Sequence, residues 1–330
     1  MGWLSWGLTV ALIAVLVAEF INGWTDAPNA IATVVSTGVM SPRAAILMAI
    51  ILNMVGATAG TAVAATVGKG IVASSALNLP AITAAMIAII AWGSFAAKVG
   101  LPISKSHSLL AGLAGAGFAG GGLGALQWTG WSKVFLGMFC AIPFGFFASW
   151  LIAKLIVAFA GRMAPGRAKR RFDRLQIASA GFMAFNHGLN DGQKFMGVFA
   201  LTLLLGGATT TFEIPFWIIL ICALTMGAGT SFGGWRIIET VGTKMTRIVS
   251  WQGFAAEASA SSTIFVASLF GIPLSTTHTI TSCIVGAGAA RRWGDVRWGV
   301  LKRIVMAWVV TFPVCAVIAF VAAKIAVRVF

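Results

Sequence analysis

The stretch "GLPISKSHSLLAG" (residues 100–112) recurs as "GIPLSTTHTITSC" (residues 271–283), 171 positions further along the chain. Both copies place Gly, Pro, Ser and His in the same order, within a chain that is otherwise mostly apolar. Proline is favoured at the start of a helix and serine as its cap, so each copy predicts that a new helix begins directly after the proline. We therefore expect two equivalent helical hairpins whose tips carry hydroxyl groups.

The composition places most of this chain in lipid. Of its 330 residues, 59% are hydrophobic and 9% are charged, whereas a soluble domain carries about 25% charged residues. The apolar runs are continuous and rich in Gly and Ala, which favours helices over the alternating strands of a transmembrane barrel. The predicted fold class is therefore an all-α polytopic membrane protein.

The basic residues predict how the chain is oriented in the membrane. The net charge of +15 is concentrated in short loops between apolar runs, so we expect no nucleic-acid partner. Fifteen Lys and Arg fall in one set of loops, 41–43, 161–174, 229–250 and 291–303. Four fall in the other set, which comprises both termini, 68–80, 121–133 and 207–213. Cytoplasmic loops carry the excess of Lys and Arg. We expect a multi-pass protein of the cell inner (plasma) membrane, with both termini outside, loop 161–174 in the cytoplasm and the lipid bilayer as a partner.

A second pair of polar segments divides the chain into halves. The segments "NGWTDAPNA" (22–30) and "NHGLNDGQK" (186–194) interrupt apolar runs and align Asp26 with Asp191 and Asn29 with Lys194. Irregular backbone inside a bilayer is tolerated only where protein or water satisfies it, so we expect broken helices that line a site. Two halves of opposite orientation form an inverted repeat, which is the plan of many secondary transporters. We predict two inverted-topology repeats with broken helices and re-entrant helical hairpins, at 1–160 and 175–330, joined by the basic cytoplasmic linker 161–174.

The hairpin tips predict an anion site. A helix N-terminus attracts anions through its free N–H groups and its dipole, and hydroxyl and ammonium groups add further donors. Asp26 and Asp191 suit hydrogen phosphate better than sulfate, because hydrogen phosphate has an O–H to donate to a carboxylate and sulfate has none. The candidate substrate-binding residues are Ser104, Lys105, Ser106, Ser275, Thr276, Thr277, Asp26 and Asp191.

These motifs resemble those of the inorganic phosphate transporter (PiT) family. The resemblance is carried by "NGWTDAPNAIAT" (22–33), by "NHGLNDGQKFMGV" (186–198) and by the paired G-x-P-[IL]-S-x-[ST]-H tips. It implies a phosphate symporter driven by Na⁺ or H⁺, and commonly a homodimer. It also implies binding roles for Asn29 and for the matching aspartates and tip hydroxyls, and it places Glu257 near the ion path.

Two lysines depart from the usual family pattern. Lys105 occupies a tip position where a hydroxyl residue is usual, and Lys194 stands opposite Asn29. We hypothesise that these ammonium groups replace at least one sodium site, which favours H⁺ as the driving ion. For Lys105 the alternative that its head reaches water also remains. His187 is a candidate proton relay beside Asp191. The candidate coupling-ion or proton residues are Asp26, Asn29, Asp191, Lys194, His187 and Glu257.

The predicted function is cation-coupled symport of inorganic phosphate, with H⁺ favoured over Na⁺ and no enzymatic activity. We expect no catalytic residue, no resident metal and no cofactor, although a divalent metal could travel with phosphate. A sulfate permease of the same fold and a small-anion channel remain alternatives. A membrane enzyme would need a nucleophile with its base or a metal cluster, and the sequence arranges neither. Glu19 could pair with Lys98, Lys105 or Lys194, and the sequence leaves that choice open.

Overall fold

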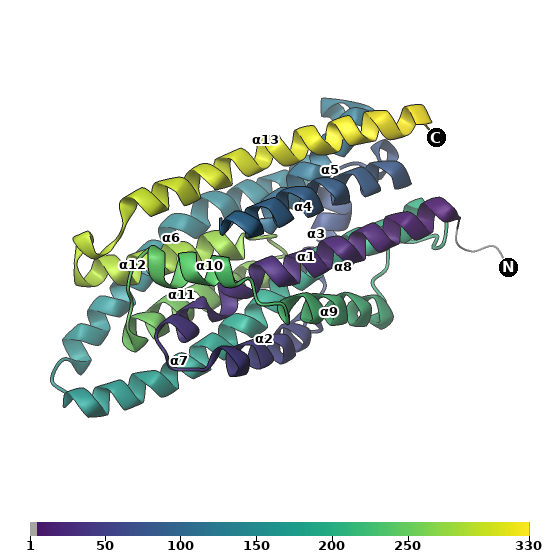
Figure 1. Ribbon diagram of the computed structural model, residues 1–330. Coiled ribbons are helices and arrows are strands. Elements are labelled where there is room, and N and C mark those ends of the chain that lie inside the picture. The colour runs from purple at the N-terminus through teal and green to yellow at the C-terminus, as the bar shows by residue number, and fades with distance from the viewer. Residues whose placement is uncertain (1–4, 330) are drawn as a thin grey trace.

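Long helices packed side by side make up the protein (Figure 1). The computed structural model describes residues 5–329, with side chains through residue 326. The first half contains α1 (Trp6–Ser36), α2 (Pro42–Ala57), α3 (Ala62–Gly70), α4 (Leu79–Val99), α5 (Lys105–Gly121) and α6 (Trp128–Ala160). The second half contains α7 (Pro165–His187), the π-helical segment η3 (Gly188–Gly192), α8 (Gln193–Leu205), α9 (Phe216–Thr230), α10 (Trp235–Glu239) with η4 (Thr240–Lys244), α11 (Ser250–Leu269), α12 (Thr276–Arg291) and α13 (Trp298–Val329).

The two halves repeat the same order of elements. Helix α1 corresponds to α7 and α8, and α2 to α6 correspond in turn to α9 to α13. Short 3₁₀ turns follow both second hairpin limbs, η2 (Leu123–Ala125) and η5 (Trp293–Asp295). The α4–α5 hairpin enters from the end of the molecule that holds the start of α1 and the end of α13, whereas the α11–α12 hairpin enters from the opposite end (Figure 1). The chain is therefore an all-α polytopic protein of two inverted repeats with re-entrant helical hairpins.

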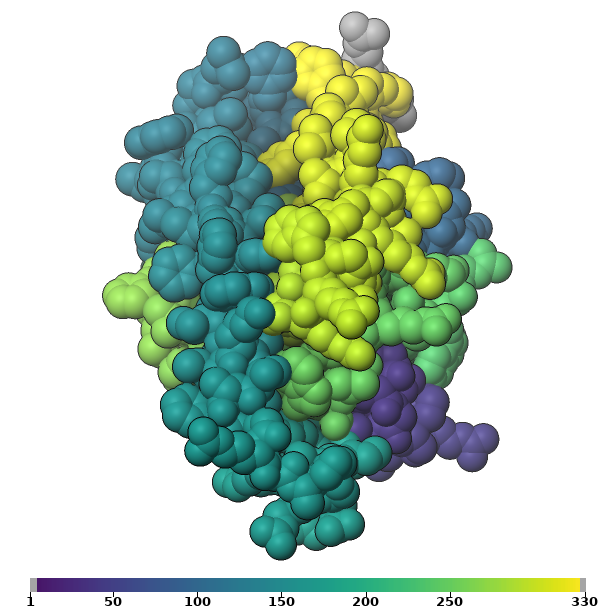
Figure 2. Space-filling view, turned by 90° about the vertical axis from the view of Figure 1, so that its left-hand side faces the viewer, coloured from purple at the N-terminus to yellow at the C-terminus, as the bar shows by residue number. Residues whose placement is uncertain are grey.

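Several helices are suited to a bilayer. Four of them, α1, α4, α6 and α13, are long and apolar enough to cross it, and two bent pairs could each add one span. Helix α6 has 33 residues, which corresponds to a length of about 50 Å. Helices α6 and α13 lie on one face of the molecule (Figure 2), and their large apolar side chains point outward, including Phe139, Phe144 and Val309. Such a surface is compatible with lipid and not with water, so the chain is a multi-pass membrane protein.

The breaks in the helices lie partly where we did not expect them. Segment 22–30 is helical throughout, with Pro28 inside α1. Proline removes one backbone donor and leaves the carbonyl of Trp24 without its usual partner. Gly234, with a φ of +31°, packs its backbone against that carbonyl and the proline ring, so a Cβ there would lie 2.9 Å from both. The helix continues past Pro28, with Gly234 packed closely against the altered turn.

The second polar segment has a different form. Residues 188–192 are the π-helical segment η3, which carries Asp191 into the interior. An extra residue in one helical turn shifts the side chains that follow, and such segments are frequent at functional sites. The sharp bends occur instead at equivalent places in the two halves. They are 70° between α2 and α3, and 67° between α9 and α10.

Glycine allows α2 to pack directly on the centre of the second repeat. A Cβ on Gly188 would lie 2.0 Å from the carbonyl oxygen of Asn53, and one on Gly56 would lie 1.9 Å from that of Phe185. Only glycine permits this approach of two backbones, as at other close helix contacts in membranes. The contact holds α2 against η3 and so places the side chain of Asn53 beside the polar segment.

The basic linker predicted at 161–174 is mostly helical. Residues 165–174 form the first turns of α7, and an ion pair of 2.7 Å joins Lys169 to Asp173 there. The hydrogen bond from Lys169 holds the pKa of Asp173 below its usual value. The boundaries 1–160 and 175–330 remain predictions.

Candidate functional site

The two hairpin tips begin with capped helices, as the sequence predicts. Ser104 is the N-cap of α5 and accepts a hydrogen bond from the backbone N–H of His107 at 3.2 Å. Ser275 is the N-cap of α12 and accepts the equivalent bond from His278, also at 3.2 Å. Both serines are buried. Two helix N-termini, with their partial positive charge, thus lie inside the protein.

The tips are in direct contact and bond each other reciprocally. The hydroxyl of Ser106 donates to the carbonyl of Leu274 at 3.1 Å. The hydroxyl of Thr277 donates to the carbonyl of Ile103 at 3.4 Å. These two bonds are equivalent, because residues 106 and 277 align in the repeat, as do 103 and 274. The protein therefore brings both predicted tips together at its centre.

Lys194 ties the second repeat to both tips. Its ammonium donates to the carboxylate of Asp191, to the hydroxyl of Ser106 at 2.5 Å and to the carbonyl of Leu274 at 2.7 Å. An ammonium has three protons to donate, and all three have acceptors here. Lys194 is 2% exposed, so all three contacts lie in the interior, away from water.

The other oxygen of Asp191 faces the second tip. It accepts a hydrogen bond from the hydroxyl of Thr276 at 2.8 Å and lies 3.2 Å from Nε2 of His187. The Nδ1 atom of His187 lies 3.1 Å from the side-chain oxygen of Asn53 on α2. The imidazole is thus held between an amide and a carboxylate, which is a suitable position for the proposed proton relay.

The corresponding polar residues of the first repeat, Asp26, Asn29 and Lys105, make fewer hydrogen bonds. Asn29 donates to the hydroxyls of Thr277 at 2.9 Å and Thr276 at 3.4 Å. Within residues 5–329, no donor is hydrogen-bonded to the carboxylate of Asp26, and the ammonium of Lys105 has no hydrogen-bond acceptor, although both residues are buried. The charge of Lys105 is the largest opposite charge acting on Asp26. A carboxylate and an ammonium are therefore left available beside the tips.

Lys105 does not extend to water. It is 2% exposed, and its ammonium lies against α4, where a Cβ on Gly93 would come within 3.2 Å of Nζ. The alternative in which its head leaves the interior does not fit this position.

Three side chains of the cluster could together coordinate a cation. Asp26, His187 and Asp191 each offer a ligand atom, and these atoms lie within 4.8 Å of one another. Asp191, one of the two aspartates that would bind such an ion, already accepts a hydrogen bond from Lys194. The ammonium therefore already supplies positive charge where a bound cation would lie.

Glu257 lies in a separate polar cluster. Its carboxylate accepts hydrogen bonds from the hydroxyls of Thr33 and Ser179 and from the amide of Gln176 at 3.4 Å. The amide oxygen of Gln176 in turn accepts a bond from Thr37 at 2.9 Å. Glu257 is thus not part of the tip cluster, although Thr33 follows Asn29 by one turn of α1.

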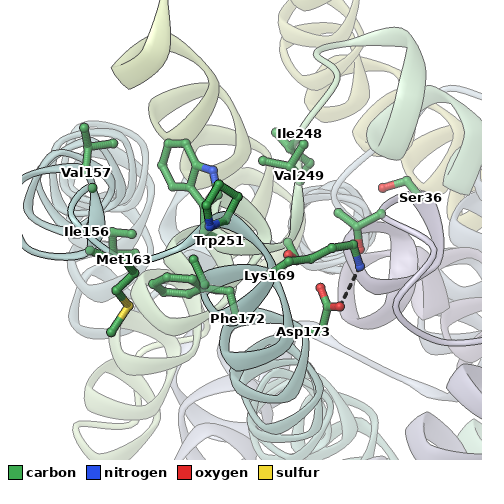
Figure 3. A pocket seen from close by; sticks show the side chains of 16 residues that line it. Ser36, Ile156, Val157, Met163, Lys169, Phe172, Asp173, Ile248, Val249 and Trp251 are labelled. Carbon is green, nitrogen blue, oxygen red and sulfur yellow. Dashed lines mark hydrogen bonds and ion pairs between the residues drawn. The ribbon is translucent and has the colours of Figure 1, made fainter.

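This second cluster leads to a cavity at one end of the molecule. Thr37 lines a cavity of about 530 Å³ between the ends of α1, α6, α7 and α11. Figure 3 shows Trp251 and Phe172 in its wall and the Lys169–Asp173 pair at one side. The cavity lies at the end of the molecule for which the basic loops predict cytoplasm. Through Thr37, which bonds Gln176, the cavity lies beside the Glu257 cluster.

The matched histidines hold the tips in place. The rings of His107 and His278 are 4.4 Å apart and meet edge to face, and His278 packs against Trp308 at 3.7 Å. The indole N–H of Trp308 donates to the carbonyl of Pro102 at 2.8 Å. Helix α13 thereby contacts both tips through Trp308.

Sequence reasoning missed several buried amides that shape the site. Gln193 accepts hydrogen bonds from the backbone N–H groups of Val63 at 2.9 Å and Ala64 at 3.4 Å, which caps the start of α3. Asn190 donates to Ser268 at 2.8 Å, beside the second tip. The available signal was their position in the polar segment 186–194, because a buried amide needs a partner.

Comparison with known proteins identifies the family. Residues 22–319 match the description "Phosphate transporter family". The chain belongs to the phosphate transporter family. It is 40% identical over 318 residues to the "Probable low-affinity inorganic phosphate transporter" of Rhizobium meliloti (strain 1021), covering 96% of this chain and 95% of the relative. The protein of the same description from Bacillus subtilis (strain 168) is 37% identical over 319 residues, covering 96% of each.

A solved structure supports the fold of this phosphate transporter family member. The chain described as "The sodium-dependent phosphate transporter" superposes with a TM-score of 0.83 at 25% identity, covering 99% of this chain and 100% of that one. The resemblance to the PiT family is thus confirmed. The relatives are described as transporters and not as enzymes, in agreement with the prediction of a non-enzymatic function.

Proposed function

We propose that this family member is a cation-coupled symporter of inorganic phosphate that binds its substrate between the two hairpin tips. The observation that carries the proposal is the reciprocal contact of the tips, through Ser106–Leu274 and Thr277–Ile103. This contact brings two capped helix N-termini to one place, where their free N–H groups can replace water around a small oxyanion.

The polar groups beside the tips fit hydrogen phosphate. The ammonium of Lys105 supplies a charge-assisted donor, and the hydroxyls of Ser104, Ser106, Ser275, Thr276 and Thr277 supply further donors once they exchange their present partners. Asp26 accepts the O–H of the substrate, because its carboxylate has no donor from the described chain. A sulfate ion offers no such proton, so the pair Lys105 and Asp26 favours phosphate.

The coupling ion in this proposal is H⁺. Lys194 donates hydrogen bonds to Asp191, Ser106 and Leu274, and so its ammonium occupies the place equivalent to Asn29. His187 and Asp191 are the proton-relay pair, and Glu257 holds the ion on its way to the cavity at the basic end. The alternative, coupling to Na⁺, is supported by the solved relative, which is described as sodium-dependent.

The test is radiolabelled phosphate uptake into proteoliposomes under an imposed H⁺ or Na⁺ gradient. We expect accumulation with a pH gradient in Na⁺-free buffer and no inhibition by excess sulfate. Asp26→Asn and Asp191→Asn should each abolish accumulation. Strict dependence on Na⁺ would refute H⁺ coupling, competition by sulfate would favour a sulfate permease, and equilibration without accumulation would indicate a channel.

Two further parts of the proposal concern the assembly in the membrane. We propose that both termini face outward, with the basic end in the cytoplasm, and that the transporter functions as a homodimer. Exposure of the site to the two sides in turn would follow from rocking or elevator-like movement of the hairpins. A divalent metal can travel with phosphate as a neutral complex, and no resident metal is required.

A further inference from the structure

Glu19 is a buried carboxyl group that the proposed substrate site does not use. It lies in α1 and is 0% exposed. One carboxylate oxygen, Oε2, accepts a hydrogen bond from the side-chain amide of Asn22 at 3.0 Å. None of the ion pairs among the described residues includes Glu19, so Lys98, Lys105 and Lys194 all lie beyond 4.0 Å of its carboxylate. The carboxyl group is therefore held by a single neutral donor.

Two oxygen atoms of this pair have no partner among the described residues. They are Oε1 of Glu19 and Oδ1 of Asn22, and both are buried. A bare buried oxygen of this kind is costly. One proton satisfies both atoms, because a protonated Oε1 becomes a donor and Oδ1 is the acceptor on the neighbouring side chain. The result is a paired acid and amide with two complementary hydrogen bonds.

A metal cation fits the same place less well. Hard cations in proteins take about six or more oxygen ligands, and this pair offers only two free ones. A proton needs one donor atom and one acceptor atom, which is what the pair supplies. The geometry therefore favours protonation of Glu19 over binding of an ion.

The other buried carboxylates have partners that Glu19 lacks. Glu257 accepts from Thr33, Ser179 and Gln176, and Asp191 accepts from Lys194 and Thr276. Asp26 has no donor, but its charge is opposed by the ammonium of Lys105. Glu19 has one neutral donor for two oxygens and no ion pair.

The charges around Glu19 also favour its protonated form. The groups that act on it from packed elements are Cys222 of α9, Lys194 of α8 and Asp191 of η3, and Asp26 acts from α1 itself. Each of the two carboxylates already has an ammonium that opposes it, Lys194 for Asp191 and Lys105 for Asp26. A third negative charge on Glu19 would have no nearby partner to balance it.

We propose that Glu19 carries the proton that is transported together with phosphate. This inference rests on the proposed H⁺-coupled symport and names the group that holds the ion. The proton binds to Oε1 from water on one side of the membrane and closes the pair with Asn22. It leaves to water on the other side, which restores the carboxylate, and no other bond is made or broken. Because Glu19 lies about two turns of α1 before Asp26, a proton there is close to the anion without contacting it.

The decisive variant is Glu19→Gln. A glutamine has the shape of the protonated acid, and its amide can donate to Asn22 while its oxygen accepts. We expect exchange of labelled for unlabelled phosphate, measured without any gradient, to stay within about twofold of the unmodified protein. With one proton per phosphate, a pH gradient of one unit supports about a tenfold ratio of internal to external phosphate. In Glu19→Gln this accumulation should be lost, so that the internal concentration only equals the external one.

Two further variants complete the set. Glu19→Asp keeps a carboxyl group and should recover pH-driven accumulation in part. Glu239→Gln changes an exposed carboxylate and should leave both exchange and accumulation unchanged. In the unmodified protein, infrared spectra should contain the C=O stretch of a protonated buried carboxyl, and Glu19→Gln should remove it even if that variant transports poorly.

The outcomes separate this inference from the proposed function. If the unmodified protein shows no accumulation with a pH gradient, H⁺ symport itself is wrong. If it does accumulate phosphate and Glu19→Gln accumulates it equally well, the role of Glu19 is overturned. Loss of exchange together with accumulation in both Glu19→Gln and Glu19→Asp would also overturn it, since a structural role would then suffice. Absence of the infrared band would do so independently.

Discussion

At the residue scale, the position of Lys105 depends on a glycine in a different helix. A Cβ on Gly93 would lie 3.0 Å from Cε and 3.2 Å from Nζ of Lys105, and 3.2 Å from a methyl group of Ile21. All three distances are shorter than ordinary contacts, so a side chain there must displace the ammonium. Gly93 therefore leaves the space in which Lys105 can reach the substrate.

We predict that Gly93→Ala weakens phosphate binding. Displacing a charged donor from its acceptor costs about 1.5–3 kcal/mol, so the KM for phosphate uptake should rise on the order of tenfold or more. The measurement is the initial uptake rate at varied phosphate concentration. Gly7→Ala is the matched control, because its Cβ would meet nothing closer than 3.6 Å. An unchanged KM in Gly93→Ala would show that Lys105 does not contact the substrate.

The sequence predicted the hydroxyls of the site better than its amides. Ser104 and Ser275 could be identified because proline and serine at a helix start leave a local pattern, and the caps are confirmed. Gln176 and Gln193 leave none, since each bonds to a segment far away in the chain. These distant contacts decide which buried carboxylates have hydrogen-bond donors. The sequence therefore could not predict that Glu257 has several donors and Glu19 only one.

At the scale of elements, α13 fixes the tips through a single hydrogen bond and a ring contact. Trp308 donates to the carbonyl of Pro102 and packs its ring on His278. One indole thus contacts a residue of each hairpin. Movement of either tip must break the bond or the ring contact.

We predict that Trp308→Phe loosens the first tip. The ring contact with His278 is kept while the bond to Pro102 is lost, which should cost about 1 kcal/mol and leave a buried carbonyl without its donor. Thermal unfolding in detergent should occur at lower temperature. The matched control is Trp298→Phe, because Trp298 makes the same kind of bond to the carbonyl of Trp293 at 3.2 Å but in an exposed position. Equal effects of the two substitutions would contradict the role of α13.

The paths of the helices were only partly predictable from their sequences. The hairpin positions follow from local signals at Pro102 and Pro273, and the structure has both. Pro28 predicted a break that does not occur, and Gly234 of a distant segment packs against the altered turn. Residues 188–192 are π-helical, and α2 approaches them closely at Gly188. Local patterns indicate where a helix is weak, but neighbouring elements decide what form it takes.

At the scale of the whole molecule, the start of α1 and the end of α13 lie at one end, opposite the junction of α6 and α7 (Figure 1). The loop after α8 lies at the end of the termini, and the loop after α6 lies at the basic end. Segments 161–174, 245–250 and 291–303 thus gather at the basic end, as an inverted repeat with one linker requires. Arg236 of α10 is an exception, because it donates to the carbonyl of Lys98 beside the first hairpin tip.

We predict that these ends face opposite sides of the membrane. In a background with Cys140→Ser, which removes the one cysteine that is exposed among the four, Thr210→Cys should react with an impermeant thiol reagent in intact cells. Arg162→Cys should react only after the membrane is permeabilised. The reverse pattern would invert the orientation, and reaction of both in intact cells would disprove the two-sided arrangement.

The reciprocal bonds between the tips have a consequence for the direction of transport. The bonds Ser106–Leu274 and Thr277–Ile103 join equivalent residues of the two repeats. Interchanging the conformations of the two halves would therefore leave this contact nearly unchanged. The states open to either face are then near-mirror forms of each other, and the tips give neither form an advantage. Any resting preference must come from positions where the halves differ in charge, among them Asn29 against Lys194, Thr276 against Lys105 and Ala184 against Glu19. These unmatched charges would thus set the side on which the empty carrier waits.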